Sequence, residues 1–469
     1  MSGPGLAGTR VLVMGIGRRA GGAGAIRYAV ASGAQVRVTD RGDPESFRDV
    51  VAEFADSPVE FVLGRHDETD FRWAEVVVRN PDVRRDSPYL RLAEEHGARI
   101  EMEMTLFLAA CPAPTIGVTG TKGKTTTAML THAIVQERWP GAIVAGNMGR
   151  SALDRLGEVD PAVPVTLELS SFQLEGLGEH ALAPTVAVIT NVRADHLDRY
   201  PDLAAYADAK AQIVRHQRAH DWKVVPSDDP TVAALVSGTP AAPITFGAAP
   251  DGPRTLFVAE ERFVASWDGA DLDLGPVAAL RLPGAHNQRN ALAAAGAALA
   301  VGVTDEEIRR GLARFGGVPH RLEDVATLDG VDFVNDTTAT TPEAAAAALD
   351  AFPGRPVVAI AGGSDKGLDL EPLAAALADR ARATVLLAGS ATPGLQRLLA
   401  RASVAGPFDT MGDAVRAAAD LAPDGGVVLL SPGCASFGLF VDEFDRGDQF
   451  RAAVHALTPA HPRKKPGGE

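Results

Sequence analysis

The chain has 469 residues, which is enough for about three domains of ordinary size. Its apolar share of 46% and charged share of 22% are typical of globular proteins with buried cores. Its formal net charge of −15 argues against wholesale nucleic-acid binding, because such binding needs a basic face.

The sequence carries no sign of export or of a membrane anchor. No charged leader precedes an early apolar stretch, and no run approaches the ~18 apolar residues that a membrane span needs. The two cysteines, Cys111 and Cys434, have neither a zinc nor a redox spacing and exclude a disulfide framework. We therefore expect a monomer in the reducing cytoplasm, with no membrane partner.

Short β-branched runs alternate with Ala- and Leu-rich helical stretches along the chain. This alternation predicts an α/β protein whose parallel sheets are covered by crossover helices. We expect three domains, over 1–112, 113–317 and 318–469, of which the first and third are Rossmann-like. Strands are expected at 11–14, 36–39, 76–78, 115–118, 165–169, 186–190, 332–334, 357–361, 384–388 and 427–430, and helices at 202–217 and 287–301.

A glycine-rich turn follows the first expected strand. Gly15 and Gly17 lie in this turn, and Asp40 ends the next strand. The arrangement resembles a dinucleotide fingerprint with its ribose-binding acid, so an NAD(P)-linked oxidoreductase is one interpretation. The spacing is imperfect, because alanine takes the place of the third glycine, and Arg18 and Arg19 make the turn basic.

A second glycine-rich turn, Gly120-Thr121-Lys122-Gly123-Lys124-Thr125-Thr126, follows an expected strand and opens an expected helix. Backbone N–H groups of such a turn can face phosphate oxygens, and the helix N-terminus adds its positive dipole end. Lys124 can bridge the β- and γ-phosphates, and a threonine hydroxyl such as that of Thr125 can reach Mg²⁺. Val118 stands where the strict pattern has its first glycine, but the strand–loop–helix context favours a nucleotide-binding central domain of the P-loop ATPase type.

Glu168 lies at the end of an apolar strand, at the edge where open α/β sheets bind ligands. A carboxylate there is either a solvated strand end or a metal ligand. Beside a phosphate loop the metal interpretation is favoured, because ATP chemistry requires Mg²⁺ held by hard oxygen donors.

The phosphate loop resembles that of the Mur ligases and of the related folylpolyglutamate synthases. Further segments resemble later Mur ligase motifs and occur in the family's order, over nearly the whole chain: Gly146–Gly149, Glu168–Leu174, Asn191–Asp198, His320–Glu323 and Ser431–Phe437. The resemblance implies an ATP-dependent ligase that adds glutamate to UDP-N-acetylmuramoyl-L-alanine through an acyl phosphate, releasing ADP and phosphate.

The resemblance also implies a metal site with two Mg²⁺ ions. Glu168 and Thr125 are expected ligands, and His196 is expected to bind the second ion, with Asp195 and Asp198 orienting it. Lys210 corresponds to a lysine that reacts with CO₂ to form a carbamate ligand. That reaction needs a neutral amine, so the pKa of Lys210 must lie below its usual value of ~10.4.

The same resemblance assigns the substrate contacts. The UDP part is expected at Gly15, Gly17, Thr39 and Asp40, and the sugar with its lactyl-alanyl arm at Asn147, Ser170 and Ser171. For ATP, Asn287 and Asn290 are expected at the adenine, Arg321 at a phosphate and Asp336 at the ribose. The glutamate contacts are expected to be Thr340, Lys366, Ser436, Phe437 and Phe444.

Thr338 departs from the family pattern, because a lysine that helps to recognise glutamate usually stands there. Losing a charge-assisted hydrogen bond costs roughly 1.5–3 kcal/mol. D-Glutamate is the favoured substrate, but a ligase preferring L-glutamate remains an alternative. A sister ligase would need a different C-terminal pocket, a folylpolyglutamate synthase would lack the UDP-type domain, and an oxidoreductase would not depend on Mg-ATP.

Overall fold

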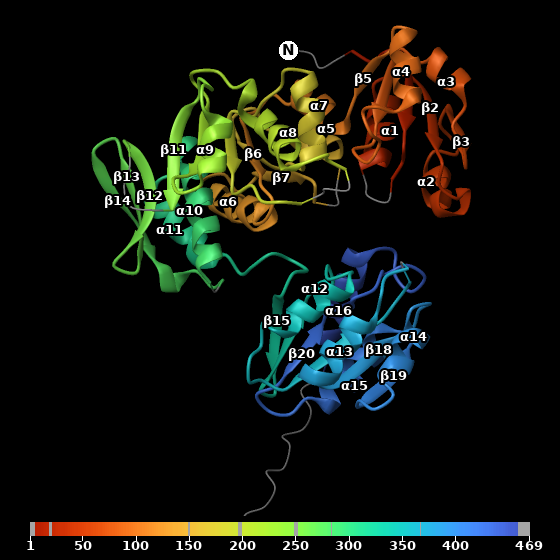
Figure 1. Ribbon diagram of the computed structural model, residues 1–469, viewed down its shortest axis with the longest axis vertical. Helices are drawn as coiled ribbons and strands as arrows, with labels where there is room; N and C mark the ends of the chain where they lie inside the picture. The colour runs from red at the N-terminus through yellow and green to blue at the C-terminus, as the bar shows by residue number, and fades with distance from the viewer. Residues whose placement is uncertain are drawn as a thin grey trace, which may run out of the picture. The chain divides into compact units, whose positions relative to one another are not determined.

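The structure is a computed structural model that describes residues 5–17, 21–148, 151–195, 199–247, 252–282, 284–365 and 367–457. The chain divides into two compact units, Met1–Phe315 and Gly316–Glu469 (Figure 1). Within the described ranges, no helix is both long and apolar enough to cross a bilayer.

The first unit opens with a five-stranded parallel sheet of order β3-β2-β1-β4-β5. Its strands are β1 (Arg10–Met14), β2 (Gln35–Asp40), β3 (Val59–Leu63), β4 (Val76–Arg79) and β5 (Arg99–Glu101). Its helices are α1 (Gly21–Ala31), α2 (Arg48–Glu53), α3 (Glu68–Trp73), α4 (Pro88–Glu95) and α5 (Glu103–Ala110). The strand order reverses between β1 and β4, so a crevice for ligands is expected outside their carboxyl ends.

A nine-stranded sheet of order β14-β13-β12-β11-β10-β9-β6-β8-β7 forms the rest of this unit. Its first strands are β6 (Thr115–Thr119), β7 (Ile143–Gly146), β8 (Val165–Glu168), β9 (Val186–Ile189), β10 (Trp222–Pro226) and β11 (Ala242–Gly247). Its helices are α6 (Lys124–Arg138), α7 (Ser171–Glu179), α8 (Leu203–Arg215), α9 (Pro230–Val236), α10 (Ala285–Ala300) and α11 (Asp305–Arg314).

Helices cover both faces of the nine-stranded sheet, with α7 and α8 on the side opposite α6 and α10 (Figure 1). Alternating strand residues show the two faces. Val225 belongs to the apolar cluster that contains residues of α7 and α8, whereas Val224 faces Gly296 of α10. The strands are therefore buried on both sides, as expected for a parallel sheet.

One edge of this sheet differs from the expectation of parallel sheets throughout. Strands β12 (Arg254–Ala259), β13 (Arg262–Trp267) and β14 (Ala270–Pro276) form an antiparallel meander, in which β12 also pairs in parallel with β11. The connections within the meander are too short for crossover helices, so they join antiparallel neighbours. Polar residues alternate with apolar ones along these strands, because one face of the edge is open to solvent.

Polar contacts join the five-stranded sheet to the nine-stranded one. The Glu103 carboxylate at the start of α5 accepts hydrogen bonds from Ser151 Oγ at 2.6 Å and from the Ala152 N–H at 2.8 Å. Arg27 of α1 pairs with Asp154 at 2.6 Å. The two sheets therefore form one compact unit.

The second unit contains a six-stranded sheet of order β15-β16-β20-β17-β18-β19. Its strands are β15 (Glu323–Leu328), β16 (Val331–Asn335), β17 (Val357–Ala361), β18 (Ala381–Leu387), β19 (Val404–Phe408) and β20 (Val427–Leu430). Only the β15–β16 pair is antiparallel among the described pairs. Its helices are α12 (Pro342–Leu349), α13 (Glu371–Arg380), α14 (Thr392–Leu398), α15 (Met411–Leu421) and α16 (Glu443–His455).

Candidate functional site

The second glycine-rich turn lies between β6 and α6, as expected. Gly123 has a φ of 85° and directly precedes the first helical residue, Lys124. A Cβ atom at Gly123 would lie 2.5 Å from Asn290 Oδ1, so both the conformation and the available space call for glycine. The turn opens the helix N-terminus toward an anion, which is the geometry of a phosphate-binding loop.

The turn is fixed by a segment that the sequence motifs did not single out for this role. The side-chain amide of Asn191 accepts from the Lys122 N–H at 3.1 Å and donates to the Lys122 carbonyl at 2.9 Å. Thr121 Oγ1 accepts from the Arg193 N–H at 2.9 Å and donates to the Arg193 carbonyl at 3.1 Å. The loop after β9 therefore clamps the phosphate loop, and the same loop leads to His196.

Two lysines meet at the start of the phosphate loop. Lys124 Nζ donates to the Gly120 carbonyl at 3.0 Å, and Lys210 Nζ of α8 donates to the same oxygen at 2.9 Å. Lys210 is 1% exposed, and its ammonium lies 4.6 Å from the ring centre of Tyr206. Burial, and then the charge of Lys124, lower the pKa of Lys210 to about 7, against the opposing effect of Asp195.

Glu168 ends β8 at the same edge of the sheet and is 2% exposed. One carboxylate oxygen accepts from Asn147 Nδ2 at 3.1 Å, so two residues expected to bind different ligands lie together. The other oxygen, Oε2, is buried and has no hydrogen-bond partner among the described residues. A buried carboxylate oxygen without a donor is costly unless a cation binds it.

These observations fit a divalent cation beside the phosphate loop. Glu168 supplies an unpartnered hard oxygen, and the partly buried Thr125 lies in the first turn of α6. In the described part of the chain, no group of three or more His, Cys, Asp or Glu side chains could hold a metal ion. His196 and Asp198 lie outside the described residues, so their expected roles remain predictions.

The expected ATP contacts are divided between the two units. In the first unit, Asn290 of α10 donates to Asn287 Oδ1 at 3.2 Å, beside the phosphate loop. In the second unit, Asp336 follows β16 and accepts from the Leu322 N–H at 3.1 Å and from Ser431 Oγ at 2.9 Å. Burial raises the pKa of Asp336 to about 6, and the neighbouring Arg321 is exposed.

The N-terminal turn uses its acid internally. Asp40 Oδ2 accepts from the Ile16 N–H at 2.8 Å and from the Gly17 N–H at 3.4 Å. Thr39 is fully buried, and its hydroxyl contacts His66 Nδ1 at 2.8 Å. An acid that holds its own glycine turn is not placed like a ribose-binding acid of a dinucleotide site, which weakens the oxidoreductase interpretation.

Ser170 and Ser171 lie at the start of α7. Ser170 is the N-cap of this helix, and its Oγ accepts from the Gln173 N–H at 3.2 Å while Gln173 bonds back to the Ser170 N–H. This reciprocal capping box could have been recognised from the Ser-x-x-Gln spacing. The cap explains part of the Glu168–Leu174 motif in structural terms, and the substrate contact remains a prediction.

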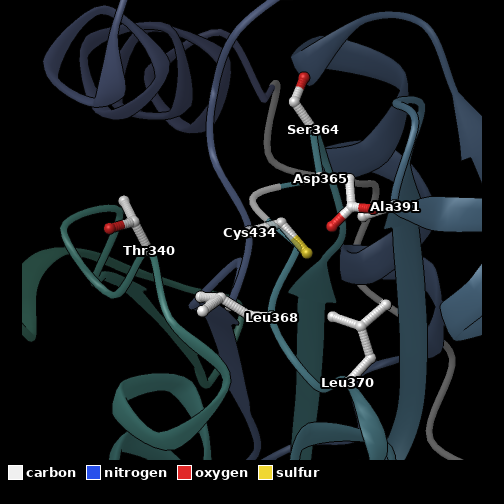
Figure 2. A pocket seen from close by; sticks show the side chains of 8 residues that line it. Thr340, Ser364, Asp365, Leu368, Leu370, Ala391 and Cys434 are labelled. Atoms are coloured by element: carbon white, nitrogen blue, oxygen red, sulfur yellow. The ribbon is translucent and has the colours of Figure 1, made fainter. Parts of the chain in front are cut away.

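A small cavity opens at the carboxyl ends of the parallel strands of the second unit. Figure 2 shows side chains from separate loops around it, among them Thr340, Asp365 and Cys434. The cavity lies where the sheet order places β20 between β16 and β17, the position at which open α/β sheets bind ligands. Lys366 lies outside the described residues.

The other expected glutamate contacts surround this region. Ser436 is buried and follows the cavity-lining Cys434, while Phe437 is partly exposed. The ring of Phe444 packs edge-on against His320, with 5.5 Å between ring centres. The structure therefore gathers Thr340, Ser436 and Phe437 near one loop cluster, whereas Phe444 packs within the protein.

Thr338, which stands in place of a usual lysine, is turned toward the chain itself. Its Oγ1 donates to the His320 carbonyl at 2.9 Å, and its N–H reaches the same oxygen at 3.2 Å. It is Thr340, two residues later, that lines the cavity.

Comparison with known proteins gives the family context of this geometry. Residues 118–298 match the Mur ligase middle domain, and residues 320–434 match the Mur ligase glutamate ligase domain. The UDP-N-acetylmuramoylalanine–D-glutamate ligase of Roseiflexus sp. (strain RS-1) is 47% identical over 465 residues, covering 97% of this chain and 100% of the relative. The ligase of the same name from Symbiobacterium thermophilum is 37% identical, covering 92% and 95%.

Solved structures show the same fold at low sequence identity. UDP-N-acetylmuramate–alanine ligase from Thermotoga maritima aligns with a TM-score of 0.56 at 20% identity, covering 96% of this chain and 99% of that one. A murein peptide ligase from Psychrobacter arcticus aligns with a TM-score of 0.51 at 18% identity, covering 96% and 100%.

Proposed function

Because this chain belongs to the Mur ligase family, we propose that it joins D-glutamate to the alanyl carboxylate of UDP-N-acetylmuramoyl-L-alanine. ATP drives the reaction through an acyl phosphate, and ADP and phosphate are released. The enzyme would serve the synthesis of peptidoglycan precursors. Full-length relatives with this activity in their names support the choice of substrates, and neither an oxidoreductase nor a folylpolyglutamate synthase is retained.

The observation that carries the proposal is the meeting of Lys124, Lys210 and Glu168 at one edge of the nine-stranded sheet. Lys124 and Lys210 share the Gly120 carbonyl, and Glu168 presents an unpartnered oxygen beside Asn147. A triphosphate in this turn would draw Lys124 from the loop carbonyls to its own oxygens. The ammonium would then stabilise the charge that develops on the transferred phosphoryl group.

Two Mg²⁺ ions would complete the site. When bound, they would screen the repulsion between the triphosphate and the attacking carboxylate. Glu168, Thr125 and His196 would hold them together with Lys210, whose low pKa supplies the neutral amine that carbamate formation needs. Arg321 of the second unit would add a planar, permanently charged contact to a phosphate.

The cavity of the second unit would hold the incoming glutamate. Thr340 and the Gly433–Cys434 backbone line it, and Lys366 and Ser436 would contact the substrate carboxylates. The amine would attack the acyl carbon, and the tetrahedral intermediate would then expel phosphate. We place the enzyme in the cytoplasm as a monomer, in keeping with two cysteines that form no disulfide.

Phosphate release with purified chain, ATP, Mg²⁺ and UDP-N-acetylmuramoyl-L-alanine tests this function, with D- and L-glutamate offered separately. We expect turnover that requires all components and strongly favours D-glutamate. Lys124→Ala should reduce kcat by about 10²-fold or more, because a transition-state charge contact is lost.

The outcomes separate the alternatives. Turnover with L-glutamate only would overturn the stereochemical choice while leaving the ligase intact. Silence with both isomers, in protein shown to be folded by its thermal transition, would remove the proposed reaction.

A further inference from the structure

Arg446 is a completely buried cation in the second unit, away from the phosphate loop. It lies in the first half of α16 with 0% exposure, and it is among the largest fully buried side chains. Burial lowers the pKa of Arg446 to about 10, an effect that the charge of Glu443 only partly offsets. The guanidinium therefore stays charged near neutral pH inside the protein.

The guanidinium joins two loops. Nε donates to Thr337 Oγ1 at 2.9 Å and Nη2 donates to the Thr337 carbonyl at 2.9 Å, whereas Nη1 donates to the Cys434 carbonyl at 3.2 Å. Thr337 belongs to the loop after β16, and Cys434 belongs to the loop after β20. These strands are neighbours in the sheet, so Arg446 fixes the distance between their two loops.

Both loops line the cavity that would receive glutamate. Thr340 comes from the first loop, and Gly433 and Cys434 come from the second (Figure 2). A backbone hydrogen bond of 2.9 Å from Gly433 to Ala339 adds a second link between them. Any movement at Arg446 would therefore change the width of the cavity.

Close packing holds the arginine in place. Gly447 follows it, and a Cβ atom there would lie 2.3 Å from His320 Nδ1 and 2.6 Å from Thr337 Cγ2. Only glycine lets α16 approach this closely, and the close approach brings the guanidinium to the Thr337 backbone.

The charge has a second consequence. All three acceptors of Arg446 are uncharged oxygens, so the positive charge is not neutralised by the hydrogen bonds that hold it. Burying such a cation is costly, and an apolar side chain would fill the same space at lower cost. A fixed positive charge behind the cavity wall favours a dianionic amino acid, and it does so at low local dielectric.

We propose that Arg446 is a positioning residue of the amino-acid pocket, setting its width and supplying the positive charge that Thr338 does not. The proposal rests on the proposed function, since glutamate is taken as the occupant of the cavity. Arg446 need not touch the substrate.

Steady-state kinetics of Arg446→Gln, Arg446→Lys and Arg416→Gln test this role, with KM measured separately for glutamate, ATP and the UDP-linked acceptor. Arg416 is a surface residue of α15 that pairs with Asp413, so its variant removes the same charge from the same unit without touching the cavity loops. For Arg446→Gln we expect the KM for glutamate to rise at least about tenfold, as for a lost charge-assisted interaction. The other two KM values should stay within about twofold.

Arg446→Lys keeps the charge but loses the fork, so its KM for glutamate should lie between those of the wild type and Arg446→Gln. A merely structural role would instead lower the thermal transition and shift all three KM values together, which would overturn the proposal. If Arg446→Gln does not fold, a lysine variant with an unchanged glutamate KM would overturn it as well. An inactive wild type would refute the proposed function, whereas an active wild type with unaffected variants would refute only the role of Arg446.

Discussion

At the residue scale, Lys210 is the side chain whose environment departs most informatively from that of an ordinary lysine. It is buried beside Lys124, and it donates to a loop carbonyl rather than to a carboxylate. Its pKa falls to about 7 in the folded protein, whereas the unfolded chain keeps the usual lysine value. The neutral amine is therefore available near physiological pH.

This difference predicts how stability depends on pH. Between about pH 7 and pH 10 the unfolded chain binds the proton of Lys210 and the folded protein does not, so the free energy of unfolding rises with pH. The contribution has a slope of up to about 1.4 kcal/mol per pH unit. In CO₂-free buffer, Lys210→Met should lose this slope in chemical denaturation across that range. An identical pH dependence in the wild type and the variant would contradict the buried neutral amine.

Residue roles were predictable from the sequence only where a spacing carries chemistry. The glycines and lysine of the phosphate loop announced their place, and Glu168 was recognised from its position at a strand end. Asn191 clamps Lys122 through both backbone groups, yet no local spacing signals it because the two residues are 69 positions apart. Arg446 was missed for a similar reason, since an arginine in a helix reads as a solvated residue until its burial is known.

At the element scale, the phosphate loop depends on how closely α6 and α10 approach. Gly123→Ala would place a Cβ atom 2.5 Å from Asn290 Oδ1 at a φ of 85°. We expect a loss of at least about 1 kcal/mol in the free energy of unfolding, from strain at a left-handed position. The KM for ATP should also rise, because the loop and Asn290 move apart.

Gly141→Ala provides the matched control. This glycine precedes β7, and a Cβ atom there would meet no other atom within 4 Å. Its variant should keep both wild-type stability and the wild-type KM for ATP. Equal effects at Gly123 and Gly141 would show that the close approach of Asn290 does not matter.

Every strand and helix expected from the sequence is present, because apolar runs and Ala-rich stretches report burial directly. The order of strands in each sheet was not predictable, since it depends on pairings between distant segments. The meander of β12 to β14 was missed because its polar and apolar residues alternate within short segments. Such segments resemble loops when parallel sheets are expected.

At the scale of the whole molecule, the expected ATP contacts lie on two separate compact units. Lys124 and Asn290 belong to the first unit, and Arg321 and Asp336 belong to the second. One nucleotide can use both sets only if the units close around it. We therefore predict that a non-hydrolysable ATP analogue with Mg²⁺ and the UDP-linked acceptor lowers the radius of gyration in small-angle X-ray scattering. An unchanged radius at saturating ligand would contradict closure.

The account depends most on where the triphosphate binds. A crystal structure with a non-hydrolysable ATP analogue and Mg²⁺ tests this directly. We predict phosphate oxygens on the backbone N–H groups of 120–125, with Lys124 turned from the Gly120 carbonyl to the phosphates and a cation on Glu168 Oε2. A nucleotide bound elsewhere, or Glu168 left without a cation at saturating ligand, would contradict the account.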